Sequence, residues 1–134
     1  MIDAACKTYI YDSRAKKLQS LRLAVPAAMT SPELFELSHH SMFIMDTQKR
    51  AVLFDLRMVS EVCTRQFEQD FTAGCFYDSK YLVMGDQNLY FVQETDLSVK
   101  DALDYGQCGV KTLSCSESVL VSAGFDCSVQ VYKK

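Results

Sequence analysis

The chain has no tryptophan, and only five glycines and two prolines occur among its 134 residues. It also lacks a long apolar run, and a membrane-spanning helix needs about 20 apolar residues, so membrane insertion is not expected. The N-terminus has neither the basic start nor the apolar centre of a secretory signal. With 49% hydrophobic residues and a net charge of −3, the composition is that of one folded domain rather than a disordered chain.

The cysteines are widely separated, and no two of them form a Cys-x-x-Cys pair. A disulfide framework or a zinc site would require tighter clustering. Their positions in or beside apolar segments are typical of buried, reduced thiols. We therefore expect a cytoplasmic or nuclear protein in which these thiols are unpaired: Cys6, Cys63, Cys75, Cys108, Cys115 and Cys127.

Motifs that carry chemistry are absent as well. The sequence has no glycine-rich phosphate-binding loop and no His-Glu-x-x-His metal motif. His39 and His40 are neighbours, and on an extended chain neighbours point to opposite faces, so they do not form a metal pair. The basic stretch at residues 14–17 is too short for a nucleic-acid surface. We predict no catalytic residue, no metal site, no cofactor and no nucleic-acid partner.

What the chain does contain is a repeat. An apolar segment, a polar turn and a second apolar segment ending in a bulky residue recur at residues 41–57, 80–94 and 118–133, and an incomplete copy lies at 4–12. The last bulky residues of these copies are Tyr11, Phe54, Val92 and Tyr132, which are 43, 38 and 40 residues apart. Such a period built from strands predicts stacked sheets, none of which buries its faces alone.

Each period holds about four short strands. Strand-like segments precede the repeated copies at 34–37, 72–77 and 110–114 and follow them at 17–23 and 59–67. Because the turns between them are short, the strands of each sheet must be antiparallel. Residues 24–32 contain both prolines and are predicted to form a loop. Residues 96–106 form either an outer strand or one turn of helix capped by Ser98.

Four antiparallel strands in forty residues, closed by a bulky residue and an acid, resemble the WD-repeat family of β-propellers. Tyr11-Asp12 and Phe54-Asp55 take the place of the family's Trp-Asp pair, whereas Val92 and Tyr132 keep only its position. The resemblance implies an all-β fold of four-stranded blades, about three to four of them, with strands named a to d from the centre outwards. A β-sandwich or barrel is the alternative. Residues 1–134 would form a single domain with blade remnants at 1–23, a blade at 34–67, a blade at 71–104 and a last blade at 109–134.

The family also places an acid in the turn between strands b and c, six residues before the aromatic residue. Asp86 and Asp126 stand at this offset, and Gln48 stands there in the copy that ends at Phe54, with Asp46 two residues earlier. A carboxylate in such a turn accepts backbone N–H groups and stabilises it. We therefore expect Asp86 and Asp126 to be structural turn residues.

The blades are too few for a common closed ring. The chain begins within a blade and ends on strand c, and it looks like the C-terminal part of a larger propeller. A half-ring would expose two apolar blade faces, and exposed patches of that size mark interfaces. We expect protein partners, with another chain or a second copy completing the propeller.

The resemblance implies a non-catalytic scaffold that mediates protein–protein interactions in a larger complex. Partners of such propellers usually dock on the loops between strands d and a and between strands b and c. The residues of these loops are the binding candidates, with Phe125 as the best anchor: Lys49, Arg50, Asp70, Gln87, Asn88, Tyr105 and Phe125.

Two other functions remain open. Phe54-Asp-Leu-Arg57 resembles the Trp-Asp-x-Arg tail of substrate receptors of cullin-type ubiquitin ligases, in which Arg57 would meet the adaptor, although Lys49 stands where the longer motif has an acid. The other alternative is a small β-fold enzyme that uses a cysteine thiolate, which requires one thiol of unusual reactivity.

Overall fold

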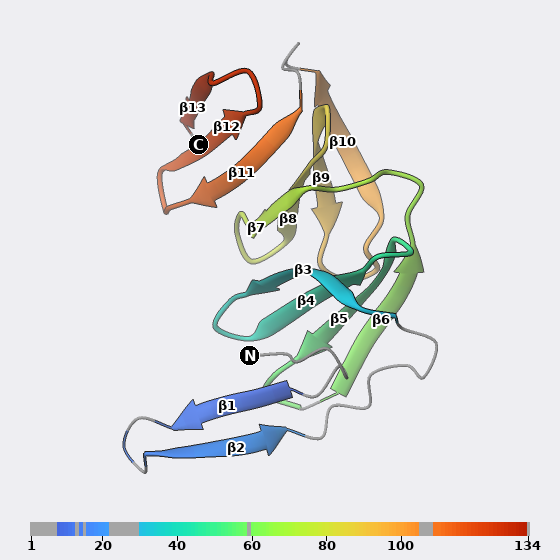
Figure 1. Ribbon diagram of the computed structural model, residues 1–134, viewed down its shortest axis with the longest axis vertical. Coiled ribbons are helices and arrows are strands. Elements are labelled where there is room, and N and C mark those ends of the chain that lie inside the picture. The colour runs from blue at the N-terminus through green and yellow to red at the C-terminus, as the bar shows by residue number, and fades with distance from the viewer. Residues whose placement is uncertain are drawn as a thin grey trace.

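The computed structural model describes residues 8–12, 14, 16–21, 30–58, 60–104 and 109–133. These residues form thirteen β-strands in four sheets (Figure 1). The first is the hairpin of β1 (Thr8–Asp12) and β2 (Lys17–Leu21). The second contains β3 (Pro32–Leu37), β4 (Ser41–Asp46), β5 (Arg50–Asp55) and β6 (Ser60–Gln66). No helix in this part of the chain is long and apolar enough to cross a membrane.

The third sheet contains β7 (Ala73–Phe76), β8 (Tyr81–Gly85), β9 (Asn88–Gln93) and β10 (Val99–Asp104). The fourth contains β11 (Val110–Cys115), β12 (Val119–Gly124) and β13 (Val129–Lys133). Within each sheet the strands follow one another in chain order, and every neighbouring pair is antiparallel. The fold is therefore all-β, built from successive antiparallel sheets as the repeat predicted.

Two segments resolve questions that the sequence left open. Val99–Asp104 is the outer strand β10, so the strand interpretation of this region is confirmed and the helical one is wrong. Pro32 was predicted to lie in a loop, but it opens β3. A proline is tolerated at the first position of a strand because no ladder N–H is needed there. Residues 24–29 of the predicted loop lie outside the described part of the chain.

The three larger sheets repeat the same internal register. The bulky marker residue of strand c pairs with an apolar residue of strand b in each of them, and the three pairs are Met42–Phe54, Leu82–Val92 and Leu120–Tyr132. The next pair in each hairpin points to the opposite face of its sheet. We call the face toward the sheet before it in sequence the preceding face, and the other the following face.

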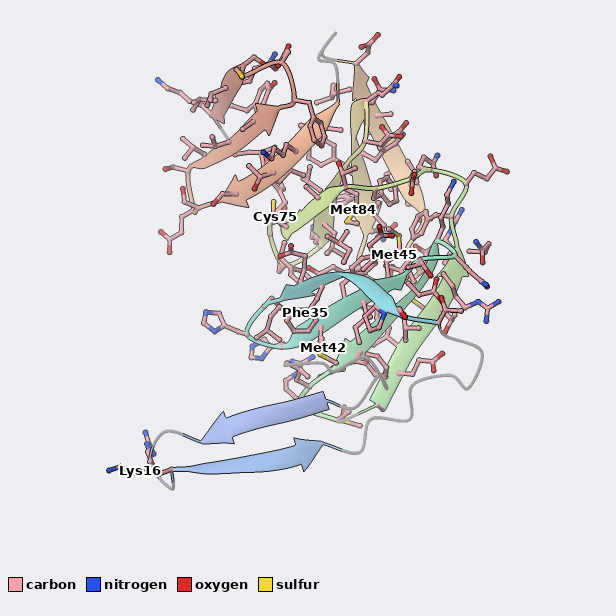
Figure 2. The ribbon with its side chains drawn as sticks, viewed as in Figure 1. Lys16, Phe35, Met42, Met45, Cys75 and Met84 are labelled. Atoms are coloured by element: carbon pink, nitrogen blue, oxygen red, sulfur yellow. The ribbon has the colours of Figure 1, made fainter. Side chains whose placement is uncertain are left out.

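Successive sheets pack through these faces. One apolar core joins the following face of the β3–β6 sheet to the preceding face of the β7–β10 sheet, and Figure 2 shows Met45 and Met84 between the two sheets. Its buried residues on the b and c strands are Phe43, Met45, Ala51, Leu53, Leu82, Met84 and Val92. A second core joins the β7–β10 sheet to the β11–β13 sheet, with Val83, Leu89, Val110, Leu113 and Leu120 buried in it.

The preceding face of the β3–β6 sheet is not an open apolar surface. On the preceding face of the β3–β6 sheet, the side chains of the two central strands are at most 2% exposed, and they form a third cluster of Met42, Ile44, Val52 and Phe54. The large apolar side chains that are exposed on this sheet lie on its edge strands β3 and β6, namely Phe35, Leu37 and Val62. The hairpin β1–β2 lies near this end in the view of Figure 1. Among the three larger sheets the β3–β6 sheet therefore has a largely buried preceding face, and the open apolar face expected at the N-terminal end of the row stays a prediction.

Candidate protein-interaction surfaces

Two of the predicted binding loops contact each other at one edge of the β3–β6 sheet. In the β3–β6 sheet the turn between β4 and β5 contacts the segment that follows β6. The Phe67 N–H donates to the Lys49 carbonyl at 2.9 Å, and the Lys49 Nζ donates to the Glu68 carbonyl at 3.1 Å. The side chain of Lys49 is thus held against its own sheet, and its backbone adopts φ +64°. Arg50 is the first residue of β5 and is half-buried.

Asp46 holds the turn between β4 and β5, and the offset used in the sequence does not find it. The side chain is fully buried. Its Oδ1 accepts the N–H groups of Gln48 and Arg50, both at 2.9 Å, and its Oδ2 accepts the N–H of Thr30 at 3.0 Å. Gln48, which stands at the predicted offset, is exposed and takes no such role. An aspartate at the very end of an apolar strand was the available signal.

Asp86 and Asp126 lie in the corresponding turns of the next two sheets. The Asn88 N–H donates to Asp86 Oδ1 at 2.8 Å, and the Ser128 N–H donates to Asp126 Oδ1 at 3.0 Å. The Ser128 hydroxyl donates to the same oxygen at 2.6 Å, and these bonds lower the pKa of Asp126. The backbone of Asp86 also accepts the Val110 N–H at 2.6 Å, which ties this turn to the following sheet.

The remaining binding candidates are placed as follows. Phe125 lies at the tip of the turn between β12 and β13, and its side chain is 58% exposed. Its N–H donates to the carbonyl of Gly109, and its ring lies close over this glycine, 3.3 Å from where a Cβ would be. Gln87 is exposed, whereas Asn88 is half-buried and donates from Nδ2 to Tyr90 Oη at 3.4 Å. Asp70 is exposed, and Tyr105 lies outside the described residues.

Arg57 is exposed, but its guanidinium is bound within its own turn. Nη2 lies 2.8 Å from Asp55 Oδ2, and Nε donates to Asp55 Oδ1 at 3.1 Å. Hydrogen bonds from the Arg57 side chain and backbone lower the pKa of Asp55 to about 2. An adaptor would have to compete with this bidentate pair, and the receptor function of Phe54-Asp-Leu-Arg57 stays a prediction.

The cysteines of the described part are thiols rather than disulfides: Cys63, Cys75, Cys115 and Cys127. Burial raises the pKa of Cys63, and the charges of Asp96 and Glu61 raise it further, which opposes thiolate formation there. Cys75 is buried. Cys6 and Cys108 lie outside the described residues. Within the described ranges, no three His, Cys, Asp or Glu side chains gather in a group that could hold a metal ion.

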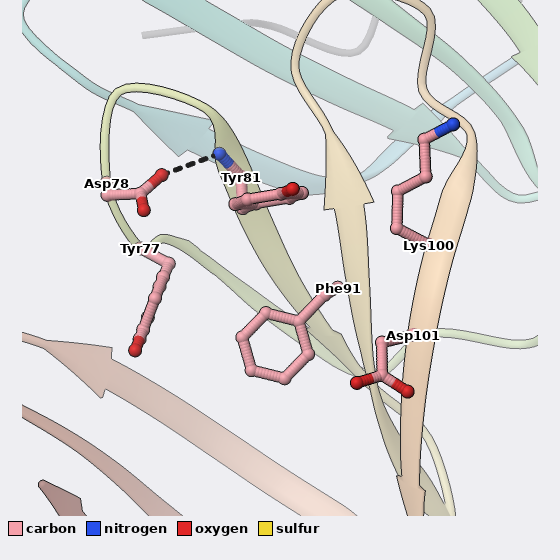
Figure 3. Close-up of a pocket in the computed structure, with 6 residues that line it drawn as sticks. All are labelled: Tyr77, Asp78, Tyr81, Phe91, Lys100 and Asp101. Atoms are coloured by element: carbon pink, nitrogen blue, oxygen red, sulfur yellow. Dashed lines mark hydrogen bonds between the residues drawn. The ribbon is translucent and has the colours of Figure 1, made fainter. Parts of the chain in front are cut away.

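An aromatic pocket that the sequence did not indicate opens on the β7–β10 sheet (Figure 3). Its volume is about 410 Å³. Phe91 forms edge-to-face contacts with Tyr77 and Tyr81, with ring centroids 5.4 and 6.5 Å apart. The charged side chains at its rim are Asp78, Lys100 and Asp101. Tyr77 directly follows β7, Tyr81 begins β8 and Phe91 lies in the middle of β9, so only the folded sheet brings the three rings together.

The following face of the β11–β13 sheet is the largest departure from the packing of the other sheets. Val129 and Val131 are 65% and 61% exposed. Their cross-strand partners Ala123 and Val121 are only half-buried. The equivalent pairs of the β3–β6 sheet are Met45–Ala51 and Phe43–Leu53, and all four side chains are at most 1% exposed. Positions that are buried in the core of the β3–β6 sheet thus form an open apolar surface in the β11–β13 sheet.

Glu36 is a half-buried carboxyl group between the first two large sheets. Its Cγ lies 3.6 Å from where a Cβ on Gly74 would be, in the same region as the Met84 side chain. Burial raises the pKa of Glu36 to about 7. The charged form is therefore disfavoured in the folded chain.

The raised pKa of Glu36 predicts that the stability of the chain depends on pH. Between pH 4.5 and 7 the folded chain binds a proton at Glu36 that the unfolded chain has lost, so its contribution to stability is present at low pH and falls as the pH rises through this window. Glu36→Gln removes the charge. Allowing for solvent screening, we expect the free energy of unfolding of the variant to rise by about 1 kcal/mol relative to that of the native chain when the pH is raised from 5 to 8. Urea denaturation of both proteins at pH 5 and pH 8 measures their free energies of unfolding. If the difference between the two proteins is the same at both pH values, the assignment is contradicted.

No protein-family model matches the chain, and no curated protein matches it. Among solved structures, the structure of U3-55K matches with a TM-score of 0.76 and 16% identity, over 99% of this chain and 44% of that one. The RRP9 WD40 repeats match with a TM-score of 0.71 and 14% identity, over 98% and 46%. The computationally designed Ika4 protein matches with a TM-score of 0.70 and 14% identity, over 97% and 81%.

These likenesses concern the fold alone, because the identities are low. The chain spans less than half of the U3-55K and RRP9 chains that it matches. Each match extends over almost the whole length of this chain, so all of its sheets take part in the resemblance. The chain therefore has the fold of WD40-type β-propeller blades, and two of its antiparallel sheets in the described residues have the full four strands.

Proposed function

We propose that the chain is a non-catalytic scaffold segment that binds other proteins, and that another chain or a second copy completes its row of blades. The observation that carries this proposal is the open following face of the β11–β13 sheet. The following face of the β3–β6 sheet is covered by the β7–β10 sheet, and that of the β7–β10 sheet is covered by the β11–β13 sheet. The scattered, reduced cysteines support a cytoplasmic or nuclear location.

The exposed valines of this face favour its association with another apolar surface. Burying a valine side chain contributes about 1.5–3 kcal/mol relative to leaving it exposed. Val129 and Val131 together therefore contribute about 3–6 kcal/mol in any contact that covers both. Contiguous apolar surface of this kind, in a sheet that belongs to a repeat, is typical of an interface.

Light scattering behind size-exclusion chromatography tests the proposal. We expect the native chain to exceed the 15.2 kDa of a monomer at micromolar concentration, because it associates through this face in the absence of a partner. The double variant Val129→Lys, Val131→Lys should shift the mass to that of a monomer. Met58→Lys changes an apolar side chain that is 74% exposed in a turn, and serves as the matched control. A native chain that stays a compact monomer at every concentration would contradict the proposal.

A further inference from the structure

Three aromatic rings of the β7–β10 sheet line one pocket with their planes nearly perpendicular to one another (Figure 3). Tyr77 and Phe91 have ring centroids 5.4 Å apart and an interplanar angle of 89°. Tyr81 and Phe91 have centroids 6.5 Å apart and an angle of 83°. In Figure 3 the Phe91 ring is seen face-on, and the two tyrosine rings are seen edge-on at two of its sides. The rings therefore form a floor and two walls rather than a parallel stack.

The backbone fixes these rings relative to one another. The Tyr77 N–H donates to the Tyr81 carbonyl at 2.9 Å. Asp78 Oδ1 accepts the N–H groups of Lys80 and Tyr81 at 2.7 and 2.8 Å, and the second bond is drawn in Figure 3. Phe91 lies on β9, which pairs with every residue of β8, the strand that Tyr81 begins. The pocket is therefore preorganised, which lowers the entropic cost of binding a ligand.

The rim of the pocket is predominantly acidic. Asp101 is the cross-strand partner of Phe91, so its carboxylate lies on the same face of the sheet as the Phe91 ring. Asp78 supplies a second carboxylate. Lys100 also lines the pocket, but in Figure 3 its side chain points away from Phe91. Charge complementarity therefore favours a positively charged ligand.

The spacing of the rings suits a rounded cation. The face of an aromatic ring is negative, and it attracts a cation within about 6 Å of the centroid. A cation about 4.5 Å above two perpendicular rings lies between centroids about 6.4 Å apart, close to the observed 5.4 and 6.5 Å. A planar guanidinium instead stacks parallel to a ring face, and a primary ammonium is strongly hydrated. Methyl groups on the nitrogen weaken that hydration and fill the space between the walls.

We propose that this pocket binds a quaternary ammonium group, such as the trimethylammonium end of a trimethylated lysine side chain or of choline. Tyr77, Tyr81 and Phe91 would contact the group from three sides, and the carboxylates of Asp78 and Asp101 would supply the opposite charge. The volume of about 410 Å³ is sufficient for a small molecule or a single long side chain. The site is separate from the open face of the β11–β13 sheet, so this inference does not rest on the proposed function.

Choline and its neutral analogue, in which a carbon atom replaces the nitrogen, provide matched probes because they differ in charge and hardly in shape. An NMR titration of the amide signals of the full chain measures their binding. We expect choline to shift the amide signals of residues 77–81 with a dissociation constant on the order of 1 mM, and the neutral analogue to bind at least about tenfold more weakly. Equal binding of the two would show recognition of apolar shape alone and would overturn the inference. Absence of saturable choline binding would also overturn it.

A labelled peptide distinguishes the two sources of the group. A fluorescein-labelled glycine peptide with one central trimethyllysine is titrated with the full chain and followed by fluorescence anisotropy, beside the same peptide with unmodified lysine. Binding at least about tenfold tighter than that of choline would assign the group to a polypeptide side chain, and equal affinity would assign it to a small molecule. Both results support the quaternary ammonium site. An unmodified lysine peptide that binds as tightly as the trimethylated one would overturn it.

Substitutions of the lining residues locate the site. Tyr81→Leu removes one wall and should weaken choline binding at least about tenfold, whereas Tyr81→Phe keeps the ring and should bind within about twofold of the native chain. Asp101→Asn removes one exposed charge and should weaken binding about two- to fivefold. Phe35→Leu removes a ring that is 38% exposed on β3, and this matched control should bind like the native chain. Native-like binding by a folded Tyr81→Leu variant would overturn the inference. A chain that self-associates yet ignores choline would leave the proposed function standing.

Discussion

Asp46→Ala is expected to lower the free energy of unfolding by about 3–5 kcal/mol, the largest effect of any turn substitution in this chain. The fully buried carboxylate accepts three backbone N–H groups, from Thr30, Gln48 and Arg50. A hydrogen bond to a charged group contributes about 1.5–3 kcal/mol, and a buried donor left without a partner costs about 1–3 kcal/mol. Alanine would remove the acceptor oxygens of all three N–H groups at once.

Urea denaturation of the native chain and its variants measures this loss. Asp46→Asn keeps an oxygen for Gln48 and Arg50 but places an amide where Thr30 needs an acceptor, so it should lose about half as much. Asp126→Ala is the matched control at the exposed turn, and its effect should be smaller because water replaces the lost carboxylate. Equal losses for Asp46→Ala and Asp126→Ala would show that burial of Asp46 contributes nothing.

The same carboxylate predicts loss of stability in acid. Burial alone would raise the pKa of Asp46, but the hydrogen bonds from Thr30, Arg50 and Gln48 outweigh it and lower the pKa below 3.8. A group with a lowered pKa stabilises the fold above its unfolded pKa, and this contribution is lost as the pH falls through its folded value. The native chain should therefore lose stability below about pH 4, and Asp46→Asn should lose less over the same range.

The sequence predicted the sheets well because period and alternation follow from local chain properties. Phe54, Val92 and Tyr132 mark the same position on strand c in all three large sheets. Asp46 was passed over because the turn after β4 differs in length from the turn after β8, so a fixed offset selects Gln48 instead. Local pattern fixes where a strand ends but not how many residues the turn contains.

The aromatic pocket could not be predicted in this way, and the open face of the last sheet was expected from the number of blades and not from the residues that form it. Tyr77, Tyr81 and Phe91 meet only because the turn after β7 returns to β8 and β8 pairs with β9 in register. Val131 and Leu53 occupy equivalent positions with similar side chains, yet one is exposed and the other is buried. Exposure of a repeat position depends on whether a further sheet is present, which no property of the position itself encodes.

Gly85→Ala is expected to destabilise the chain by about 1–3 kcal/mol, because the junction between the last two sheets has no room for a side chain there. A Cβ on Gly85 would lie 2.8 Å from Cγ1 and 2.9 Å from Cβ of Val110. Val110 is fully buried, and its backbone is tied to the same turn through the Asp86 carbonyl. The clash would therefore push β11 away from β8 rather than rotate a flexible side chain.

Gly74→Ala is the matched control, since it adds the same methyl group to the neighbouring strand β7. Its Cβ would meet the Sδ and Cε atoms of Met84, at 2.8 and 3.2 Å, and the end of a methionine side chain moves easily. We expect it to cost much less, in part because alanine restricts the unfolded chain more than glycine does. In a Val110→Ala background, Gly85→Ala should also cost less than in the native chain, because two of the three clashing atoms are gone. Thermal unfolding of the single and double variants measures this coupling, and strictly additive losses would mean that Gly85 and Val110 do not limit the approach of the two sheets.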